Sequence, residues 1–374
     1  MAPMKRSSSE TSSSLSSPPQ VDSSTSLTVT SHDDQLQEPS AKKTKIVKQS
    51  PIMFISPGQA VDTSIIVFNQ EFRVSSVGLK ANTMYFQKFL DPSNGSTNKK
   101  YSSKFKYQWY TKVEADGGWC ISSAPEDRVS DMTAYIGDSE REEKAFHNLL
   151  RAVFSQQAVI EDATDLCRLT ILADFTCCLP VVKNSLFQTL IKNPNLYASI
   201  QKTPLELIEW ALKLRHPYLF RECLIHLLGP FHNPRYLKVE NPTIFSIARV
   251  IDQQFRAYLC NVQRDLLGLI LEGKASAQFE TVWRHHLKGS HVLVASTQTR
   301  VIYYPAWFRK LCTIDHANEE LNSAVKRILG PVLKNCLTLD GSGAQSGEGR
   351  FRDYFLCYDI PDSVMPWNEN ESDW

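Results

Sequence analysis

The pattern of polar and apolar residues predicts two strands between residues 65 and 74. The run Ile65-Ile66-Val67-Phe68 is continuously apolar, as in a strand covered on both faces, and Glu71-Phe72-Arg73-Val74 alternates, as in a half-buried strand. The short connection Asn69-Gln70 lies between them, so the pattern predicts a β-hairpin. Apolar residues between Leu79 and Leu90 then predict two short helices, and the polar stretch from Asp91 to Ser96 predicts a loop.

A second β region is predicted between residues 105 and 121. Apolar side chains fall on one face of its first strand, and they are Phe105, Tyr107, Trp109 and Val113. Asp116-Gly117-Gly118 then turns the chain into Trp119-Cys120-Ile121. Two interpretations of the aromatic face stay open: a partner surface that includes Tyr107 and Trp109, or packing into the core, which is commoner for one apolar strand face.

Helical spacing of apolar residues dominates from residue 139 onward. Ser139-Glu140-Arg141-Glu142 matches a capping box, in which a serine and a glutamate satisfy backbone N–H groups at a helix start. The inner faces of this helix and the next two carry Phe146, Leu149, Leu150 and Val153, then Leu166, Leu169, Leu172 and Phe175, then Val182, Leu186 and Leu190. This spacing predicts three amphipathic helices, the third beginning at Pro180.

Prolines and glycines delimit the helices of the second half. Thr203-Pro204-Leu205-Glu206 predicts a helix start, and that helix has to end near His216 because Pro217 follows. A further helix is expected from Pro217 to Gly229, and Asn241-Pro242 begins a long one. The apolar stripes of the long helix and of the last clear helix are Ile244, Ile247, Ile251, Phe255, Tyr258, Val262 and Leu266, and Leu321, Val325, Ile328 and Val332.

The first 50 residues differ in composition from the rest. They contain no aromatic residue and are rich in serine and threonine, so they cannot bury enough apolar area to offset chain entropy, and we expect disorder. Lys42, Lys43 and Lys45 form a basic run, which is either a nuclear localisation signal or a solvated linker. The N-terminus lacks the apolar core of about 7–15 residues that a secretory signal needs. We expect a cytoplasmic or nuclear protein, not a secreted one.

Charge and cysteine content narrow the classes of partner. Basic and acidic residues number 41 and 40, a net charge of +1, so no strong field draws the chain to DNA or to an anionic membrane. No zinc-finger, basic-zipper or RNA-recognition signature is present. We therefore expect neither nucleic-acid nor membrane binding. The nine cysteines include no Cys-x-x-Cys pair and predict buried thiols in a reducing compartment.

The motifs of common catalytic sites are absent from the sequence: there is no P-loop, no dinucleotide-binding glycine motif after a strand, and no nucleophile elbow. His285-His286 with His291 is the densest histidine group, but a metal site would need further ligands, and a polar surface is the interpretation we favour. Cys177-Cys178, and Cys223 with His226, are interpreted as core positions. We therefore predict no enzymatic activity, no cofactor and no metal site.

The stretch from Asp62 to Phe89 resembles the start of a BTB/POZ domain. That family opens with a strand hairpin that ends apolar-x-apolar, followed by a helix with the pattern Leu-x-x-x-Ser-x-x-Phe. The matching residues, all expected in the fold core, are Phe72, Val74, Leu79, Phe86 and Phe89. The stretches 72–90, 144–150, 172–175 and 213–224 are similar to BTB-domain proteins of filamentous fungi. The chain departs from the family at Ser75, at Gly78 and in the long aromatic hairpin between residues 100 and 135.

The resemblance implies an α+β fold, in which a BTB/POZ-like domain of β-hairpin plus helices, with an inserted β-hairpin, precedes a helical C-terminal region. The expected parts are a disordered Ser/Thr-rich tail (1–50), the BTB/POZ-like domain (55–195), a BACK-like helical domain (196–337) and a flexible acidic tail (338–374). The family binds proteins, so the resemblance implies a homodimer or a scaffold for partners. The alternatives are a substrate adaptor that binds the cullin scaffold of a cullin-RING ubiquitin ligase, and a nuclear transcription-associated regulator.

Overall fold

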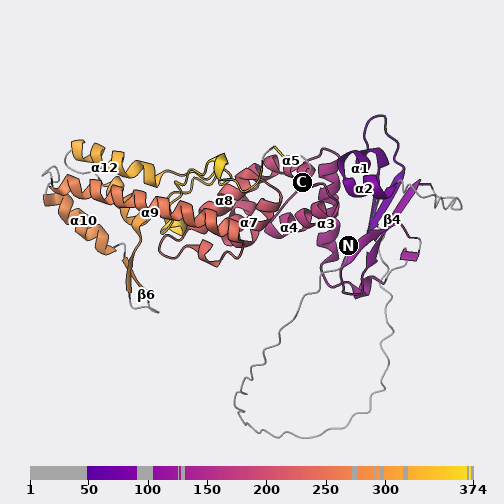
Figure 1. Ribbon diagram of the computed structural model, residues 1–374, viewed down its shortest axis with the longest axis horizontal. Helices are drawn as coiled ribbons and strands as arrows, with labels where there is room; N and C mark the ends of the chain where they lie inside the picture. Colours follow the sequence, from indigo (N-terminus) through magenta and orange to yellow (C-terminus); the bar gives the residue numbers. More distant parts are fainter. Residues whose placement is uncertain are drawn as a thin grey trace, which may run out of the picture. The chain divides into compact units, whose positions relative to one another are not determined.

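The computed structural model describes residues 49–90, 104–124, 126–127, 131–271, 277–289, 291–294, 299–314, 319–368 and 370–371. All of them belong to the compact unit that spans Lys48–Trp374. The predicted basic run of Lys42, Lys43 and Lys45 lies outside the described residues, as does almost all of the tail predicted over residues 1–50. The chain has an α+β fold, with a mixed sheet and its helices first and a largely helical region after them (Figure 1).

The first part of the chain contains a five-stranded mixed sheet. In the order in which they lie side by side, its strands are β1 (Ile52–Met53), β3 (Gln70–Val74), β2 (Thr63–Val67), β4 (Tyr107–Val113) and β5 (Trp119–Ser122). The first predicted hairpin is confirmed, because β2 and β3 are antiparallel and Ile65 lies opposite Phe72. Its turn is Phe68-Asn69, one residue earlier than expected, and Phe68 has the positive φ (47°) that tight hairpin turns require.

The second hairpin joins the same sheet. β4 lies parallel to β2, with Trp109 opposite Ile65, and β5 pairs antiparallel with β4. Thr111 of β4 ties this strand to the first hairpin: its hydroxyl accepts a 2.7 Å hydrogen bond from the Phe68 N–H and donates one of 3.1 Å to the Ile66 carbonyl. The predicted inserted hairpin is therefore an extension of the sheet.

Five described α-helices belong to this region. They are α1 (Ser76–Asn82), α2 (Met84–Leu90), α3 (Ser139–Val153), α4 (Ala163–Phe175) and α5 (Leu179–Lys192). Helix α3 packs against β2, and α4 and α5 pack against α3. The two short helices and the three amphipathic helices are thus confirmed. The predicted capping box placed the N-cap at Ser139, one residue after the observed N-cap. Asp138 is the N-cap of α3, and its carboxylate accepts a 3.1 Å hydrogen bond from the Arg141 N–H, a role that aspartate performs as well as serine.

The second part of the chain is largely helical. Its described elements are α6 (Pro194–Lys202), α7 (Pro204–Lys213), α8 (Pro217–Leu228), α9 (Pro242–Leu271), α10 (Ala277–Gly289), the antiparallel pair β6 (His291–Val294) and β7 (Thr299–Ile302), α11 (Tyr304–Thr313) and α12 (Glu319–Leu333). Helices α7, α8, α9 and α12 were predicted, whereas α6, α10, α11 and the strand pair were not. Helix α7 packs against both α4 and α8, and so connects the two parts. No described helix is both long and apolar enough to cross a membrane.

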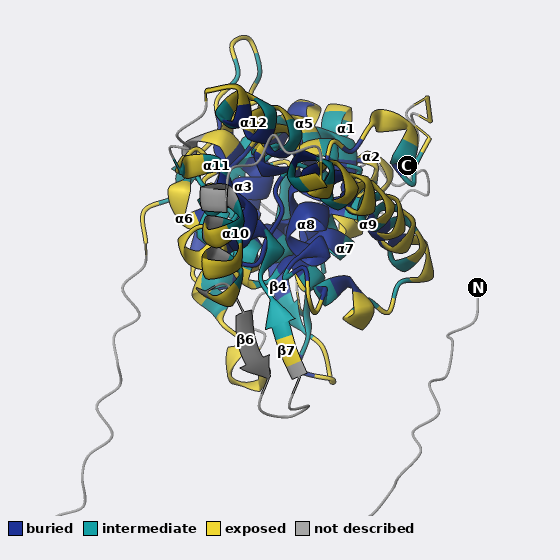
Figure 2. Ribbon diagram, turned by 90° about the vertical axis from the view of Figure 1, so that its left-hand side faces the viewer, coloured by how far each residue is buried: buried dark blue, intermediate teal, exposed yellow. Residues whose placement is uncertain are grey.

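Helix α8 is the most deeply buried helix of this region, and Figure 2 shows it in the dark blue of buried residues. His216 caps its first turn, since the imidazole Nδ1 accepts a 3.3 Å hydrogen bond from the Leu219 N–H. Burial of the ring, with a smaller contribution from the nearby Lys183 ammonium, lowers the pKa of His216 to about 4. The imidazole is therefore neutral at physiological pH and keeps the lone pair that the cap requires.

The long helix α9 buries a slightly different stripe from the predicted one. Tyr258, expected inside, is exposed, and its neighbour Leu259 is buried. Asp252 is also buried, and its carboxylate accepts hydrogen bonds of 3.0 Å from the Tyr236 hydroxyl and 2.8 Å from Arg256. A buried acidic residue of this kind is invisible to a pattern of apolar positions, because its partners come from another segment and from the next turn.

Residues 334–371 differ from the flexible acidic tail predicted over 338–374. They run back from α12 over α8 and α9 (Figure 1) and bury Leu339, Phe351, Tyr354, Phe355, Leu356, Tyr358, Ile360 and Met365. The Phe355 ring lies 5.2 Å from that of Phe231 and 5.0 Å from that of Phe255. The tail interpretation is wrong for the described residues, because this segment supplies aromatic side chains to the core without forming a regular element that a periodic pattern could predict.

Candidate interaction surface

Two helices of the first part present apolar side chains to solvent next to one another. Tyr85 and Phe89 come from α2, and Ile171 and Phe175 come from α4; these four residues are called the α2–α4 face. The Tyr85 ring lies at its centre, 4.9 Å from the ring of Phe89 and 5.1 Å from that of Phe175. Phe89, Ile171 and Phe175 are 46%, 48% and 46% exposed, which is unusual for side chains of this size and polarity.

The exposure follows from the way each helix is anchored. In α2, Phe86 and Leu90 point into the core, and this leaves Phe89 on the outer side. In α4, the inner positions are Leu166, Leu169, Leu172 and Ala173, whereas a second row at spacing four is outside or at the edge: Cys167, Ile171 and Phe175. The core positions expected for Phe89 and Phe175 are therefore wrong. The apolar second row of α4 is visible in the sequence, but the sequence does not say which of the two rows faces the core.

A hollow of about 460 Å³ adjoins the α2–α4 face between β5, α3 and α4. Its lining is mostly apolar and includes Trp119, Ile121, Phe146, Cys167, Ile171 and Phe175. Arg168 and Glu142 also line it, and they form an ion pair with each other. Ile171 and Phe175 thus belong both to the exposed face and to the hollow beside it, so the two features form one continuous apolar surface.

The thiol and phenol groups on this surface are neutral at physiological pH. Burial raises the pKa of the Cys167 thiol to about 11 and that of the Tyr85 hydroxyl to about 12. Burial, followed by hydrogen bonding to Glu114, likewise raises the pKa of Cys120 to about 11. The thiolate is the nucleophilic form of cysteine, so these thiols are poor nucleophiles here. The surface offers area and shape for contact with an apolar partner.

Four charges at the edge of the surface form two ion pairs, and the Lys88 ammonium is a further charge, 5.4 Å from the centre of the Phe89 ring. The Arg168 guanidinium is paired with Glu142, and the Lys213 ammonium of α7 lies 2.6 Å from the Asp174 carboxylate of α4. Each pair sums to zero net charge. The two ion pairs therefore add no net charge to the edge, and the Lys88 cation lies over an aromatic ring of the same face.

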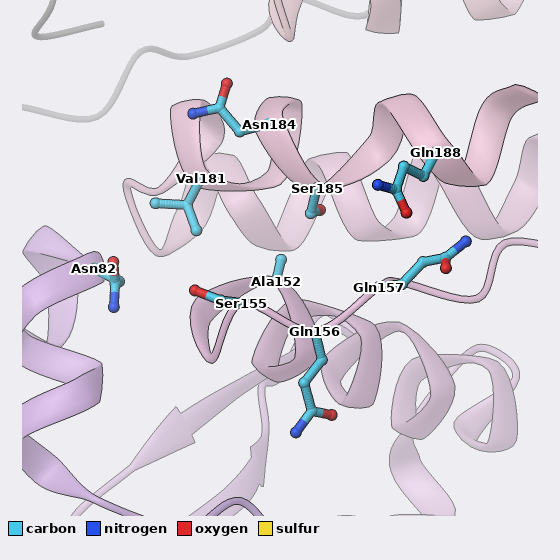
Figure 3. A pocket seen from close by; sticks show the side chains of 9 residues that line it. All are labelled: Asn82, Ala152, Ser155, Gln156, Gln157, Val181, Asn184, Ser185 and Gln188. Atoms are coloured by element: carbon cyan, nitrogen blue, oxygen red, sulfur yellow. The ribbon is translucent and has the colours of Figure 1, made fainter. Parts of the chain in front are cut away.

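A second hollow, of about 430 Å³, is lined mainly by amides and hydroxyls (Figure 3). It lies between α5, the end of α3 and the loop that follows α3, where Ser185 of α5 faces Ala152 of α3. Its polar lining residues are Asn82, Ser155, Gln156, Gln157, Asn184, Ser185 and Gln188. These side chains donate and accept hydrogen bonds but carry no charge, so the hollow lacks a general acid or base among its lining residues.

The remaining predicted site residues divide between core and surface. Phe72, Val74, Leu79 and Phe86 are buried as expected. Trp109, one of the two residues of the predicted partner surface, is 4% exposed and packs edge-on against Phe86 at 5.7 Å. The partner-surface interpretation of Trp109 is therefore wrong, and the core-packing alternative is right.

Tyr107, the other residue of that predicted surface, is half-buried. The ammonium groups of Lys106 and Lys80 lie 4.8 and 5.4 Å from the centre of its ring. The ring is thus partly covered by cations of the chain itself, an arrangement typical of a cation–π contact.

The cysteines and histidines form no metal centre within the described residues, where no three potential ligands lie together. His285 is exposed on α10, and the side chains of His286 and His291 fall outside the description. Cys223 and His226 are core residues as expected. All nine cysteines are free, and Cys177, expected in the core, is exposed at the turn between α4 and α5.

Comparison with known proteins adds no relative: no family model, no curated protein and no solved structure matches the chain. The function has to be inferred from the surfaces described above.

Proposed function

We propose that this chain is a protein-interaction module of the BTB/POZ type that self-associates through the α2–α4 face. The observation that carries the proposal is the group of exposed apolar side chains at Phe89, Ile171 and Phe175 around the half-buried Tyr85 ring, continuous with an apolar hollow. Patches of this kind on soluble chains usually mark sites where another protein binds. Three of the four residues of the α2–α4 face are aromatic, a residue type that is enriched in protein interfaces.

Two features support the BTB/POZ assignment. The residues that carry the sequence resemblance in the hairpin and in the first two helices, Phe72, Val74, Leu79 and Phe86, are buried in one core. The hairpin β2–β3 is followed directly by α1 and α2, in the order that the resemblance implies.

The departure from the family at Gly78 has a local explanation. A Cβ atom at this position would lie 2.5 Å from Cε1 of the Phe154 ring, so the branched residue usual in the family does not fit beside Phe154. Glycine at this position leaves room for the Phe154 ring, and the helix can otherwise be similar to that of the family.

Self-association is favoured because the surface is complementary to itself. In a two-fold dimer the same patch contributes on both sides, and a residue of one copy meets a different residue of the other copy. The α2–α4 face offers apolar side chains to both copies, and the pairs Arg168–Glu142 and Lys213–Asp174 add no net charge at its edge. Co-capture of two differently tagged copies of the full chain tests this proposal. Recovery of both tags on one resin is expected, and recovery of only the captured tag would contradict self-association.

The substrate-adaptor function is a second candidate, and the contact between α7 and α4 favours it. This contact fixes the helical region beside the α2–α4 face, and a helical region in that place often accompanies cullin binding in the family that the chain resembles. A pull-down with a cullin N-terminal region tests the adaptor function. Retention that is lost in Phe175→Ser but kept in Phe187→Ser, a comparably exposed phenylalanine on α5, supports it. Equal retention of both variants, or none of the unchanged chain, counts against it.

A further inference from the structure

Two arginines, Arg215 in the turn before α8 and Arg221 within α8, contact residues near the end of the chain. The Arg221 guanidinium donates a 2.8 Å hydrogen bond to the Ile360 carbonyl and forms an ion pair with Asp362. The Arg215 guanidinium lies 2.8 Å from the Glu371 carboxylate and donates a 3.4 Å hydrogen bond to the Asn368 carbonyl. Each guanidinium therefore binds one backbone carbonyl and one carboxylate of residues 358–371, which are called the strap.

An aromatic contact lies between the two arginine contacts along the strap. The Trp367 ring meets the Phe220 ring of α8 edge-on, with 5.4 Å between centroids and 85° between planes. Phe220 itself is fully buried with the strap in place. The surface beneath the strap thus combines an apolar contact at Phe220 with a cation on either side, Arg215 and Arg221, and is called the α8 site.

The strap is held by its own buried side chains Tyr358, Ile360 and Met365 and by the arginines of the fold beneath it. Its only described regular element is the single turn Asp362–Val364. The two arginine side chains are 18% and 20% exposed, whereas their partners Glu371 and Asp362 are 47% and 82% exposed. The cations are therefore fixed in the body of the fold, and the acids lie on its outside. Recognition of a largely irregular segment by an apolar contact and by arginines that bind carboxylates is a common way of binding peptides.

We propose that the α8 site binds an acidic peptide segment of another protein, with an aromatic residue near its carboxylates, and that the strap is its intramolecular competitor. Charge complementarity argues for this occupant, since the strap that fills the site carries Asp359, Asp362 and Glu371. Tethering gives the strap a high effective concentration. The apparent affinity for a partner is therefore the intrinsic affinity multiplied by the fraction of chains in which the site is open. The α8 site shares no residue with the α2–α4 face, so the two proposals stand or fall separately.

A labelled synthetic peptide with the sequence of residues 358–371 is a suitable probe, and fluorescence anisotropy with the full chain measures its binding. The variant Asp362→Asn/Glu371→Gln loses both carboxylate contacts of the strap at exposed positions. We expect it to bind the probe about tenfold more tightly than the unchanged chain does, since weakening the strap opens the site. Raising the salt concentration should weaken this binding. A probe with Trp367→Ala should bind about tenfold more weakly.

Two further variants, each added to the strap variant, make the test specific. Arg221→Glu should abolish probe binding, whereas Arg264→Glu, at an exposed arginine of α9, should leave it unchanged. A thermal melt of each variant verifies that it is folded. The proposal is overturned if the folded strap variant binds the probe no better than the unchanged chain, or if Arg221→Glu and Arg264→Glu behave alike. It is also overturned if the strap variant forms dimers by exchanging straps without binding the free probe.

Discussion

Glu222 and Asp340 are joined by a 3.1 Å hydrogen bond, in which the buried carboxylate of α8 accepts from a backbone N–H 118 residues further along the chain. The same carboxylate accepts from the N–H groups of Thr338 and Leu339 at 3.0 and 3.4 Å. One acidic side chain thereby fixes the point where the C-terminal segment meets the helical core. Burial raises the pKa of Glu222 to about 7, against the opposing effect of the three N–H donors.

This raised pKa predicts a pH dependence of stability. A carboxyl group with a higher pKa in the folded chain than in the unfolded chain, where it is near 4.5, binds more protons when folded between those values. The protonated carboxyl contributes up to about 3 kcal/mol to the free energy of unfolding. This contribution is fully present below pH 4.5 and is lost as the pH rises through about 7. Thermal melts should show the Tm of the unchanged chain falling relative to that of Glu222→Gln over this range. A constant difference would contradict the assignment.

His216 predicts the opposite trend over an overlapping pH range. Its folded pKa of about 4 lies below the ordinary value of 6.5, so protonation favours the unfolded chain. The stability that comes from keeping the ring neutral is present above pH 6.5 and is lost as the pH falls toward 4. His216→Asn keeps a good N-cap and does not titrate. The variant should therefore gain Tm relative to the unchanged chain as the pH is lowered from 7 to 4, and parallel curves would argue against this role.

Phe355 tests whether the C-terminal segment belongs to the core. Its ring is 1% exposed and contacts the rings of Phe231 and Phe255. Phe355→Ala should reduce the free energy of unfolding by about 3–5 kcal/mol, because the cavity remains largely unfilled. Asp359→Ala, at an exposed position four residues away, should change it by less than about 0.5 kcal/mol. Chemical denaturation measures both, and equal effects would restore the interpretation of this segment as a solvated tail.

Two glycine-to-alanine substitutions should change the stability of the chain in opposite directions. A Cβ atom on Gly229 would lie 2.1 Å from Cδ1 of the Tyr354 ring, so Gly229→Ala should destabilise the chain by about 1–3 kcal/mol through overpacking. Gly268 lies inside α9 with no heavy atom within 4 Å of a Cβ, so Gly268→Ala should stabilise it by up to about 1 kcal/mol. Denaturant titration of both variants distinguishes them, and a loss of stability in both would contradict the described packing.

Local patterns in the sequence predicted local structure well. Alternation around Phe72 predicted the first hairpin, and apolar spacing predicted α3, α4 and α5, because these elements are determined by neighbours within a few residues. The pairing of β4 with β2 could not be predicted in this way, since Trp109 and Ile65 are neighbours in the sheet but far apart in the sequence. Parallel pairing leaves no turn signal in the sequence.

The candidate surfaces were harder to predict for a related reason. Ile171 and Phe175 form a second apolar row on α4, but a row of apolar residues does not say which side faces the core. The α8 site depends on Arg215 and Arg221 meeting residues near the end of the chain, a contact that no local pattern encodes. Trp109 shows the converse, since an aromatic strand residue that looked available for a partner is buried beneath α2.

The most direct test of the central proposal is sedimentation equilibrium of the full chain and two matched variants at micromolar concentrations. Ile171→Asp puts a charge into the α2–α4 face, and Val250→Asp puts one at an equally exposed branched residue of α9. Charge at the centre of an interface is costly, so we expect dimers for the unchanged chain and for Val250→Asp, and monomers for Ile171→Asp. A monomeric unchanged chain, or a folded Ile171→Asp variant that remains dimeric, would contradict self-association through this face.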